Sequence, residues 1–238
     1  MGGEYAGGMC GRFVVARASE DLVPLFEVDV VADDLPAPNW NIPPGTHIPV
    51  ILDSDRSGQR QRRLESAWWS LVPRFATEFR LPYPTFNARS ETAASKPTFR
   101  ASVASQRCLI PADGYYEWAA LHGRAKAPQY IAPEDGTMLA FAGLYSWWRD
   151  PAGPDSEWRL TATILTRAAP ASLELIHQRV PLLLASDLIS DWLDPAQHGD
   201  QSLLDAVADR ALPEYERLSF HEVAPLRGNG PELLLPVG

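Results

Sequence analysis

Arg107-Cys108-Leu109-Ile110-Pro111-Ala112-Asp113-Gly114-Tyr115-Tyr116-Glu117-Trp118 is the most informative stretch of this 238-residue chain. Its two runs of aliphatic and aromatic residues, 107–111 and 115–118, predict β-strands. The segment between them, Ala112-Asp113-Gly114, is typical of a turn because Asp and Gly readily adopt turn backbone angles. The stretch therefore predicts a protein built mainly from closely spaced strands.

Similar patterns occur on both sides of this stretch. Further strands are predicted at 47–52, 63–72, 128–131, 138–147, 158–166, 180–184 and 215–223, with turns at 53–58 and 133–136. Short helices are predicted at 20–26 behind Ser19, at 98–105, 171–176 and 202–211, and at 187–193 behind Ser186, with Ser19 and Ser186 as caps. Residues 33–45 read as a Pro-rich loop. We expect an α+β fold with a mostly antiparallel sheet that can close into a barrel, and few short helices.

The composition, 45% hydrophobic and 21% charged, permits a large core. We expect one domain over residues 9–238, with two compact halves as the alternative, and we interpret residues 1–8 as a disordered extension or a misassigned start. No run approaches the ~18 apolar residues of a membrane span, and no signal-peptide pattern opens the chain. Two cysteines do not make a disulfide framework. These features predict a cytoplasmic monomer without a membrane partner, nucleoid-associated if the source is bacterial.

The charge is distributed unevenly. The chain carries a net charge of −9, which argues weakly against a nucleic-acid partner. Residues 67–126 nevertheless carry a net charge of +4, so the remainder carries −13. Such a segment is most often a solvated face, but it is also what a local phosphate-binding groove would look like.

Met9-Cys10 suggests a specific chemistry. If translation begins at Met9 and that residue is removed, Cys10 carries an α-amine and a thiol on adjacent carbons. The amine, with a pKa of about 7.7–8.0, can condense with an aldehyde to a Schiff base. The thiolate, the reactive form of sulfur, can then close a five-membered thiazolidine. The alternative is that Cys10 is an unreactive, buried residue.

Four other side chains could take part in chemistry. Glu117 lies among aromatic and aliphatic residues, so burial should raise its pKa and suit it to proton transfer, unless it faces solvent. His177 stands at a helix-to-strand junction, where a structural role is the alternative. Asn87 could orient an amine and Arg89 could hold a phosphate, or the two could be a helix cap and an exposed Arg.

The sequence lacks the common patterns for metals and cofactors. The five His lack ligand spacing and there is no Cys-x-x-Cys pair, so we expect no metal. There is also no phosphate-cradling Gly loop and no Gly-x-Ser-x-Gly elbow. We therefore expect no cofactor.

Several segments together resemble the SRAP (SOS response-associated peptidase) family. The resemblance runs from Met9 over nearly the whole chain, and the segments recur in the family's order. They are Met9-Cys10-Gly11-Arg12-Phe13, Asn39-Trp40-Asn41-Ile42-Pro43-Pro44, Trp69-Ser70-Leu71-Val72-Pro73, Asn87-Ala88-Arg89-Ser90-Glu91-Thr92, the stretch from Arg107 to Trp118, and Ile176-His177-Gln178-Arg179-Val180-Pro181.

The resemblance implies that the protein caps abasic sites in single-stranded DNA by a covalent crosslink through Cys10, with weak lyase activity as a by-product. Asn87 would position the α-amine, Glu117 would shuttle a proton, and His177 would assist ring opening and reversal. The DNA-binding residues implied by the resemblance are Arg12, Asn41, Trp69, Pro73, Phe75, Arg89 and Thr166.

Two departures from the family pattern affect this reading. Ser70 stands where Gly is usual, which would narrow the groove, and residues 1–8 would leave Cys10 without an α-amine unless Met9 is the true start or the extension is cleaved.

Two other functions stay open. A cysteine peptidase would need Cys10 as an activated thiol but no free amine, and a single-strand binding module would need no catalytic Cys10.

Overall fold

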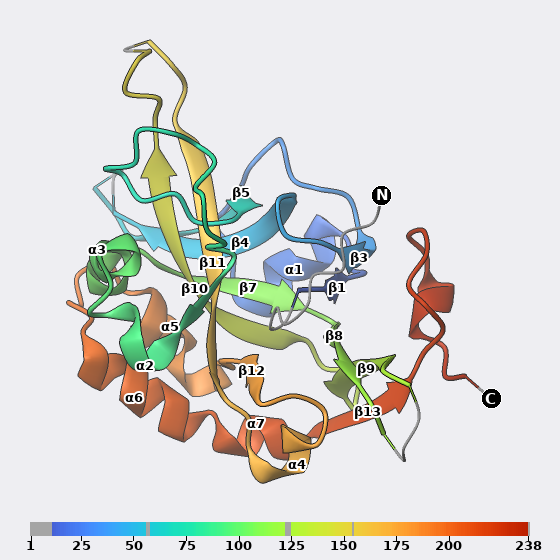
Figure 1. Ribbon diagram of the computed structural model, residues 1–238. Helices are drawn as coiled ribbons and strands as arrows, with labels where there is room; N and C mark the ends of the chain where they lie inside the picture. Colours follow the sequence, from blue (N-terminus) through green and yellow to red (C-terminus); the bar gives the residue numbers. More distant parts are fainter. Residues whose placement is uncertain (1–10, 56–57, 122–124, 154, 238) are drawn as a thin grey trace.

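The computed structural model describes residues 11–55, 58–121, 125–153 and 155–237. Cys10 and residues 1–8 lie outside the described residues. The described chain forms two sheets and a set of short helices (Figure 1). The α+β class expected from the sequence is therefore confirmed.

The larger sheet closes into a barrel. Its closed part runs in the order β11-β10-β7-β4-β5 and returns to β11. Neighbours cannot all be antiparallel around a ring with an odd number of strands, so one seam must be parallel. That seam joins β5 and β11, with Thr161 opposite Trp68 and Ala162 opposite Trp69. The strands are β4 (His47–Ser54), β5 (Gln61–Trp69), β7 (Arg107–Ala112), β10 (Leu139–Trp148) and β11 (Arg159–Ala168).

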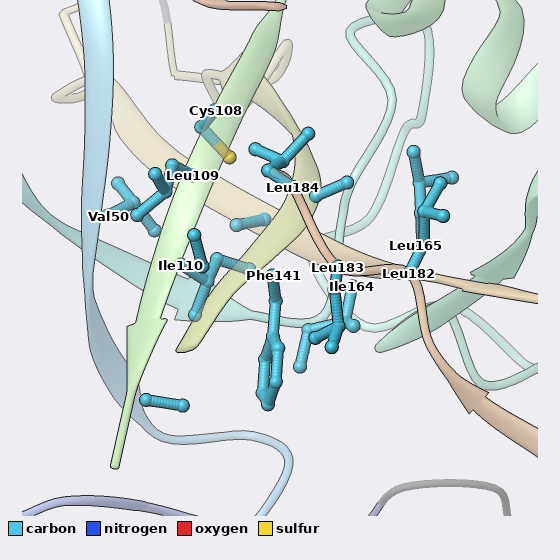
Figure 2. Close-up of a cluster of buried hydrophobic side chains, with 14 of the residues drawn as sticks. Val50, Cys108, Leu109, Ile110, Phe141, Ile164, Leu165, Leu182, Leu183 and Leu184 are labelled. Carbon is cyan, nitrogen blue, oxygen red and sulfur yellow. The ribbon is translucent and has the colours of Figure 1, made fainter. Parts of the chain in front are cut away.

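The barrel encloses an apolar core. Every residue of β7 is buried, as expected for a strand covered on both faces. Figure 2 shows Phe141 and Ile164 among the buried side chains, with Leu109 on the other side of β7, toward Val50, and all four side chains are fully buried. The barrel is therefore the main source of hydrophobic stabilisation.

The second sheet has five strands and is antiparallel throughout. Its order is β13-β9-β8-β1-β3. The strands are β1 (Phe13–Val15), β3 (Asn39–Ile42), β8 (Gly114–Ala119), β9 (Ala127–Pro133) and β13 (Leu218–Glu222). In Figure 1, β8, β9 and β13 lie to one side of the barrel, away from α2 and α6.

The two predicted strands of the opening stretch belong to different sheets. β7 is part of the barrel and β8 is part of the second sheet, so residues 112–114 form a crossover between sheets. Asp113 fixes the crossover by accepting hydrogen bonds from the Ala16 N–H at 2.6 Å and from Arg17 Nε at 3.0 Å. A Cβ on Gly114 would lie 2.5 Å from the Tyr130 hydroxyl, so only glycine fits there.

An aromatic cluster joins the second sheet to the barrel. Phe13 packs edge-on against Trp69 at 4.9 Å between ring centroids, and against Phe141 at 6.0 Å. Tyr115 also contacts Phe141 at 6.0 Å, and Trp69 contacts Phe86 at 5.9 Å. These contacts hold β1 and β8 against the barrel, and edge-on geometry is favourable for aromatic pairs.

Short elements complete the described chain. They are α1 (Ser19–Phe26), β2 (Val30–Val31), β6 (Asn87–Arg89), α2 (Ser90–Ala93), α3 (Pro97–Ser105), α4 (Ala171–Glu174), β12 (Arg179–Pro181), η1 (Ser186–Leu188), α5 (Ile189–Leu193), α6 (Gln201–Arg210), α7 (Leu212–Glu216) and η2 (Pro231–Leu234). β6 and β12 pair with β11, β6 in the parallel sense, and β2 pairs with β5.

Both predicted serine caps are wrong. α1 begins at Ser19 itself, behind Ala18, and the Ser19 hydroxyl contacts Glu20 instead of a backbone N–H. Ser186 opens η1 and likewise makes no capping hydrogen bond. The side-chain cap that does form is Asp200, which accepts from the Leu203 N–H at the start of α6.

Three other features of the structure differ from the sequence pattern. Residues 33–45 include strand β3, because its pairing with β1 overrides the local Pro-rich sequence. β9 and β10 flank the turn at 133–136 but pair with β8 and β7 respectively, not with each other. Tyr215 lies in α7, so the last strand begins only at Leu218.

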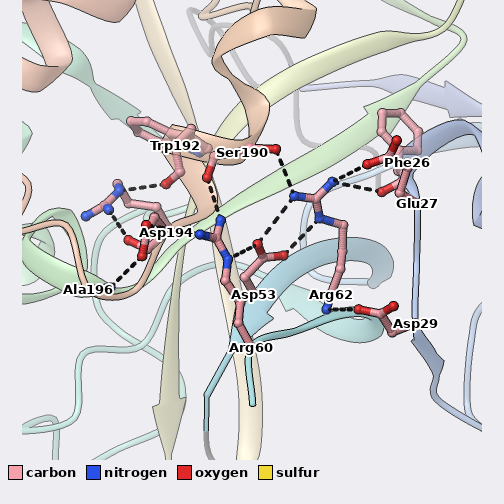
Figure 3. A network of polar contacts seen from close by, with 11 residues as sticks. Phe26, Glu27, Asp29, Asp53, Arg60, Arg62, Ser190, Trp192, Asp194 and Ala196 are labelled. Atoms are coloured by element: carbon pink, nitrogen blue, oxygen red, sulfur yellow. Dashed lines mark hydrogen bonds and ion pairs between the residues drawn. The ribbon is translucent and has the colours of Figure 1, made fainter.

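A buried carboxylate organises the hairpin between β4 and β5 (Figure 3). Asp53 is 3% exposed and accepts from Arg60 at 2.8 Å and from Arg62 at 2.9 Å. Arg60 also donates to the Ser190 carbonyl, and Arg62 donates to the Phe26 carbonyl. This network ties the hairpin to α1 and α5.

Candidate functional site

Glu117 is buried on the second sheet. Phe13 pairs with Tyr115, and the Tyr116 N–H donates to the Arg12 carbonyl at 2.9 Å. Glu117 follows Tyr116, so its strand runs beside the chain at Arg12. Glu117 is 3% exposed, so a solvent-facing strand position is excluded and the expected burial is confirmed.

Asn87 and Arg89 lie on β6 and do not open a helix, since α2 begins at Ser90. β6 pairs with β11, where Asn87 is opposite Ile164. The carbonyl of the preceding residue, Phe86, accepts from both the Ile164 N–H at 3.0 Å and Trp69 Nε1 at 2.8 Å. Two donors on one carbonyl fix the start of β6, and Arg89 is exposed beyond it.

Trp69 therefore has a supporting role. It is fully buried, and its indole contacts Phe13 and Phe86. Such a side chain can shape a groove only by positioning the residues that line it.

His177 follows α4 and is partly buried. Its Nδ1 lies 3.0 Å from the Arg179 N–H nitrogen and 3.1 Å from the Arg179 carbonyl oxygen. Nδ1 is engaged by Arg179 in either tautomer, as an acceptor or as a donor. Nε2 is thus the ring nitrogen that remains for proton transfer.

An ion pair joins two of the segments that resemble the family, a contact that the sequence analysis missed. Arg179 on β12 holds Glu91 on α2 through two bonds of 2.5 and 2.8 Å, and also donates to the Thr166 carbonyl at 2.7 Å. Burial alone would raise the pKa of Glu91, but the hydrogen bonds from Arg179 and the backbone lower it below its ordinary value. The opposite charges of Glu91 and Arg179 were the signal in the sequence from which this ion pair could have been predicted.

Arg12 and Asn41 form a second pair. The Arg12 guanidinium donates to Asn41 Oδ1 at 2.8 Å, and Asn41 Nδ2 donates to the Gly228 carbonyl at 3.0 Å. Desolvation lowers the pKa of Arg12, although the group stays charged at neutral pH. Arg12, which directly precedes β1, and Asn41, on β3, are therefore held together, and their contacts with DNA stay predictions.

The other expected DNA-binding residues differ in exposure. Phe75 is 66% exposed, whereas Pro73 is buried. Thr166 is fully buried, and its hydroxyl lies within hydrogen-bonding distance of Ala88 and Arg179. Their contacts with DNA stay predictions, and burial limits Pro73 and Thr166 to supporting neighbouring groups. The hydroxyl groups of Ser70 and Thr85 share a hydrogen bond, with 2.9 Å between their oxygen atoms.

A cavity of about 310 Å³ lies beside β6. Arg89 and Lys96 contribute positive charge to its lining, and Tyr83 is 49% exposed. The basic segment expected from the sequence does not form a single groove, however. Arg107 is 3% exposed and all its hydrogen bonds go to backbone carbonyls.

The two cysteines are not equivalent. Cys108 is fully buried in β7, and burial raises the pKa of its thiol far above the ordinary value. A protonated, inaccessible thiol is not a nucleophile. Cys10, for which the crosslinking role was predicted, lies outside the described residues.

The described residues contain neither a metal-binding cluster nor a helix that could span a membrane. No three His, Cys, Asp or Glu side chains in the described part of the chain come together as a metal site. Within the same ranges, no helix is long and apolar enough to cross a membrane.

Comparison with known proteins identifies the family. The sequence model of SOS response associated peptidase (SRAP) matches residues 9–229, so the chain belongs to the SRAP family. Abasic site processing protein YoqW of Bacillus subtilis (strain 168) is 34% identical over 230 residues, covering 95% of this chain and 99% of the relative. Abasic site processing protein YedK of Escherichia coli (strain K12) is 30% identical over 237 residues, covering 96% and 100%.

Solved structures support the fold. A protein from Bacteroides thetaiotaomicron superimposes with a TM-score of 0.78 at 19% identity, covering 96% of this chain and all of that one. At that identity the likeness concerns the fold alone, and it agrees with the architecture described above.

Proposed function

We propose that this protein recognises abasic sites in single-stranded DNA and shields them by a covalent thiazolidine crosslink through Cys10. The relatives named for abasic site processing support the substrate class. The observation that supports the mechanism is the buried Glu117 on β8, next to Tyr116, whose N–H donates to the carbonyl of Arg12, two residues from Cys10 in the sequence. The reaction requires Cys10 to be the first residue, after removal of Met9.

The chemistry balances without a cofactor. The α-amine of Cys10 adds to the C1′ aldehyde of the ring-opened sugar to give a carbinolamine. Loss of one water gives an imine, and the thiolate adds to the imine carbon while the nitrogen takes a proton. Glu117 would supply the proton that lets the hydroxyl leave, because a buried carboxylic acid is suited to that task.

Asn87 and His177 would complete the site. Asn87 would orient the α-amine from β6, whose position is fixed by the two donors on the Phe86 carbonyl. His177 Nε2 would assist opening of the sugar ring and reversal of the crosslink. The imine also explains a secondary lyase activity, because it acidifies the C2′ proton and permits elimination of the 3′ phosphate.

Arg12 and Arg89 would hold phosphates on either side of the lesion. Arg12 is positioned by Asn41, and Arg89 is exposed at the cavity beside β6. Guanidinium groups bind phosphate through two parallel hydrogen bonds. Exposed Phe75 offers an apolar surface for a base, as in other single-strand grooves.

Intact mass spectrometry tests the proposal. Protein begun at Met9 is incubated with a single-stranded oligonucleotide carrying one abasic site, alongside the form begun at Met1 and Cys10→Ala. We expect an adduct with the summed mass less one water, only when Cys10 is N-terminal. An undamaged oligonucleotide is the substrate control.

The alternatives give other results. No adduct from correctly processed protein contradicts the proposal. Peptide turnover by the form begun at Met1 would favour the cysteine peptidase. Equal retention of DNA by Cys10→Ala and the parent, without any adduct, would favour a binding module.

A further inference from the structure

Gln129 is a buried polar residue that the proposed mechanism does not use. It lies on β9, directly opposite Glu117 on β8. Only 1% of its surface is exposed. A buried amide beside a buried carboxylate makes this row of the sheet polar where its neighbours are apolar.

Gln129 and Glu117 face the same side of the sheet. Directly opposite residues of an antiparallel pair project to one face, with Cβ atoms about 4.5–5.5 Å apart. Two residues along, Tyr115 pairs with Ile131, and both belong to the apolar core. Because side chains alternate along a strand, Glu117 and Gln129 also point toward the barrel side.

The amide nitrogen of Gln129 has no partner among the described residues. No hydrogen bond joins it to Glu117 in this structure, and the backbone pairing of β9 does not use it. Burying a donor without an acceptor is unfavourable, so such a group requires an explanation, and a polar group next to a candidate catalytic carboxylate is explained by a ligand. The nitrogen therefore marks a place for an oxygen that arrives with a ligand.

We propose that Gln129 Nε2 donates a hydrogen bond to the C1′ oxygen of the abasic sugar. The inference rests on the proposed function, in which Glu117 protonates that same oxygen. An oxygen within reach of Glu117 on this face is also within reach of the opposite residue. The amide holds the carbinolamine hydroxyl while it takes the Glu117 proton, breaks its bond to C1′ and leaves as water.

The test uses three variants of protein begun at Met9. Gln129→Met keeps the side-chain length and removes the donor. Gln129→Glu replaces the donor by a group that donates only when protonated. Thr163→Val is the matched control, since Thr163 is fully buried and its hydroxyl also lacks a partner among the described residues, but it lies on β11 of the barrel.

Two measurements distinguish a chemical role from a structural one. The rate of crosslinking to abasic DNA should fall about tenfold in Gln129→Met, the effect of one hydrogen bond. Affinity for an oligonucleotide carrying tetrahydrofuran, an abasic analogue without a C1′ hydroxyl, should not change. Relative to the parent, Gln129→Glu should recover as pH falls, because the neighbouring carboxylate raises the pKa of the introduced carboxyl.

Each outcome decides the matter. Parental crosslinking rates in Gln129→Met overturn the inference while leaving the proposed function intact. No adduct from the parent overturns both. Weaker tetrahydrofuran binding, or a Gln129→Met protein less stable than the parent, would show that the amide already has a structural partner, which overturns the inference. Thr163→Val should crosslink at the parental rate.

Discussion

Two buried polar side chains on strands close in sequence have opposite surroundings. Arg107 begins β7 in the barrel, and its guanidinium donates to the carbonyls of Val103, Ala104, Trp192, Asp194 and Gln197. Gln129 lies on β9 in the second sheet, and its amide nitrogen finds no acceptor among the described residues. The guanidinium of Arg107 is thus satisfied by backbone carbonyls, whereas the amide nitrogen of Gln129 is the donor for which we propose a ligand oxygen.

The same contrast holds for titratable groups. Cys108 on β7 is enclosed by apolar side chains, and burial raises its pKa so that the thiol stays protonated. Glu117 on β8 is also buried, but it follows Tyr116, which bonds the Arg12 carbonyl near the start of the described chain, and it lies opposite the polar Gln129. The two buried groups therefore differ in their neighbours and not in their exposure.

The largest expected effect comes from removing the contact between the two regions. Phe141→Ala deletes the ring that Phe13 and Tyr115 pack against, and should destabilise the protein by about 3–5 kcal/mol because the buried site cannot collapse fully. Urea unfolding followed by tryptophan fluorescence measures the change. Phe75→Ala is the control, since a 66% exposed ring should change stability by no more than about 0.5 kcal/mol.

Arg107→Met tests the contrast between satisfied and unsatisfied groups. It should cost about 3 kcal/mol or more, because each buried carbonyl left unpaired costs about 1–3 kcal/mol. Gln129→Met, with the same new side chain, should leave stability unchanged or raise it. Thermal unfolding of both variants gives the comparison. Equal loss of stability in the two variants would show that Gln129 is as well satisfied in the folded protein as Arg107.

Gly114→Ala tests the crossover between the sheets. The added methyl group would lie 2.5–2.6 Å from atoms of the Tyr130 side chain, so Tyr130 or β8 must shift. We expect a loss of about 1–3 kcal/mol, as is usual when a packed core receives an extra methyl. Gly11→Ala is the control for stability, because a Cβ at that position meets no atom within 4 Å. Gly136→Ala is unsuitable because the φ of Gly136, +69°, is strained for alanine.

The smallest expected effect concerns the ion pair between Glu91 on α2 and Arg179 on β12. The pKa of Glu91 is lowered in the folded protein, so its contribution is present above the unfolded pKa of about 4.3 and is lost as pH falls through the folded value. Glu91→Gln should cost about 0.5–1 kcal/mol at pH 7, since Glu91 is 47% exposed. The difference from the parent should shrink toward zero below about pH 4, measured by urea unfolding across pH. A constant difference would show that the Glu91 charge is not the cause.

Local patterns in the sequence predicted a large part of the fold. The α+β class and most strands followed from apolar runs, and the burial of Glu117 followed from its aromatic neighbours. These properties depend on residues close in the chain, whose periodicity and composition are visible directly. The serine caps failed because Ser19 and Ser186 begin their helical turns instead of preceding them, a shift of one residue that local composition cannot resolve.

The sequence by itself determined most of the segments that become strands, and the motifs that identify the SRAP family. The tertiary structure alone decided that β7 and β8 part into different sheets, that β5 and β11 close the barrel in parallel, and that Arg179 reaches Glu91. It also set Gln129 beside Glu117. The physical reason is that strand pairing and ion pairing join residues far apart in the chain, and packing of the whole core selects among pairings that local sequence leaves equally possible.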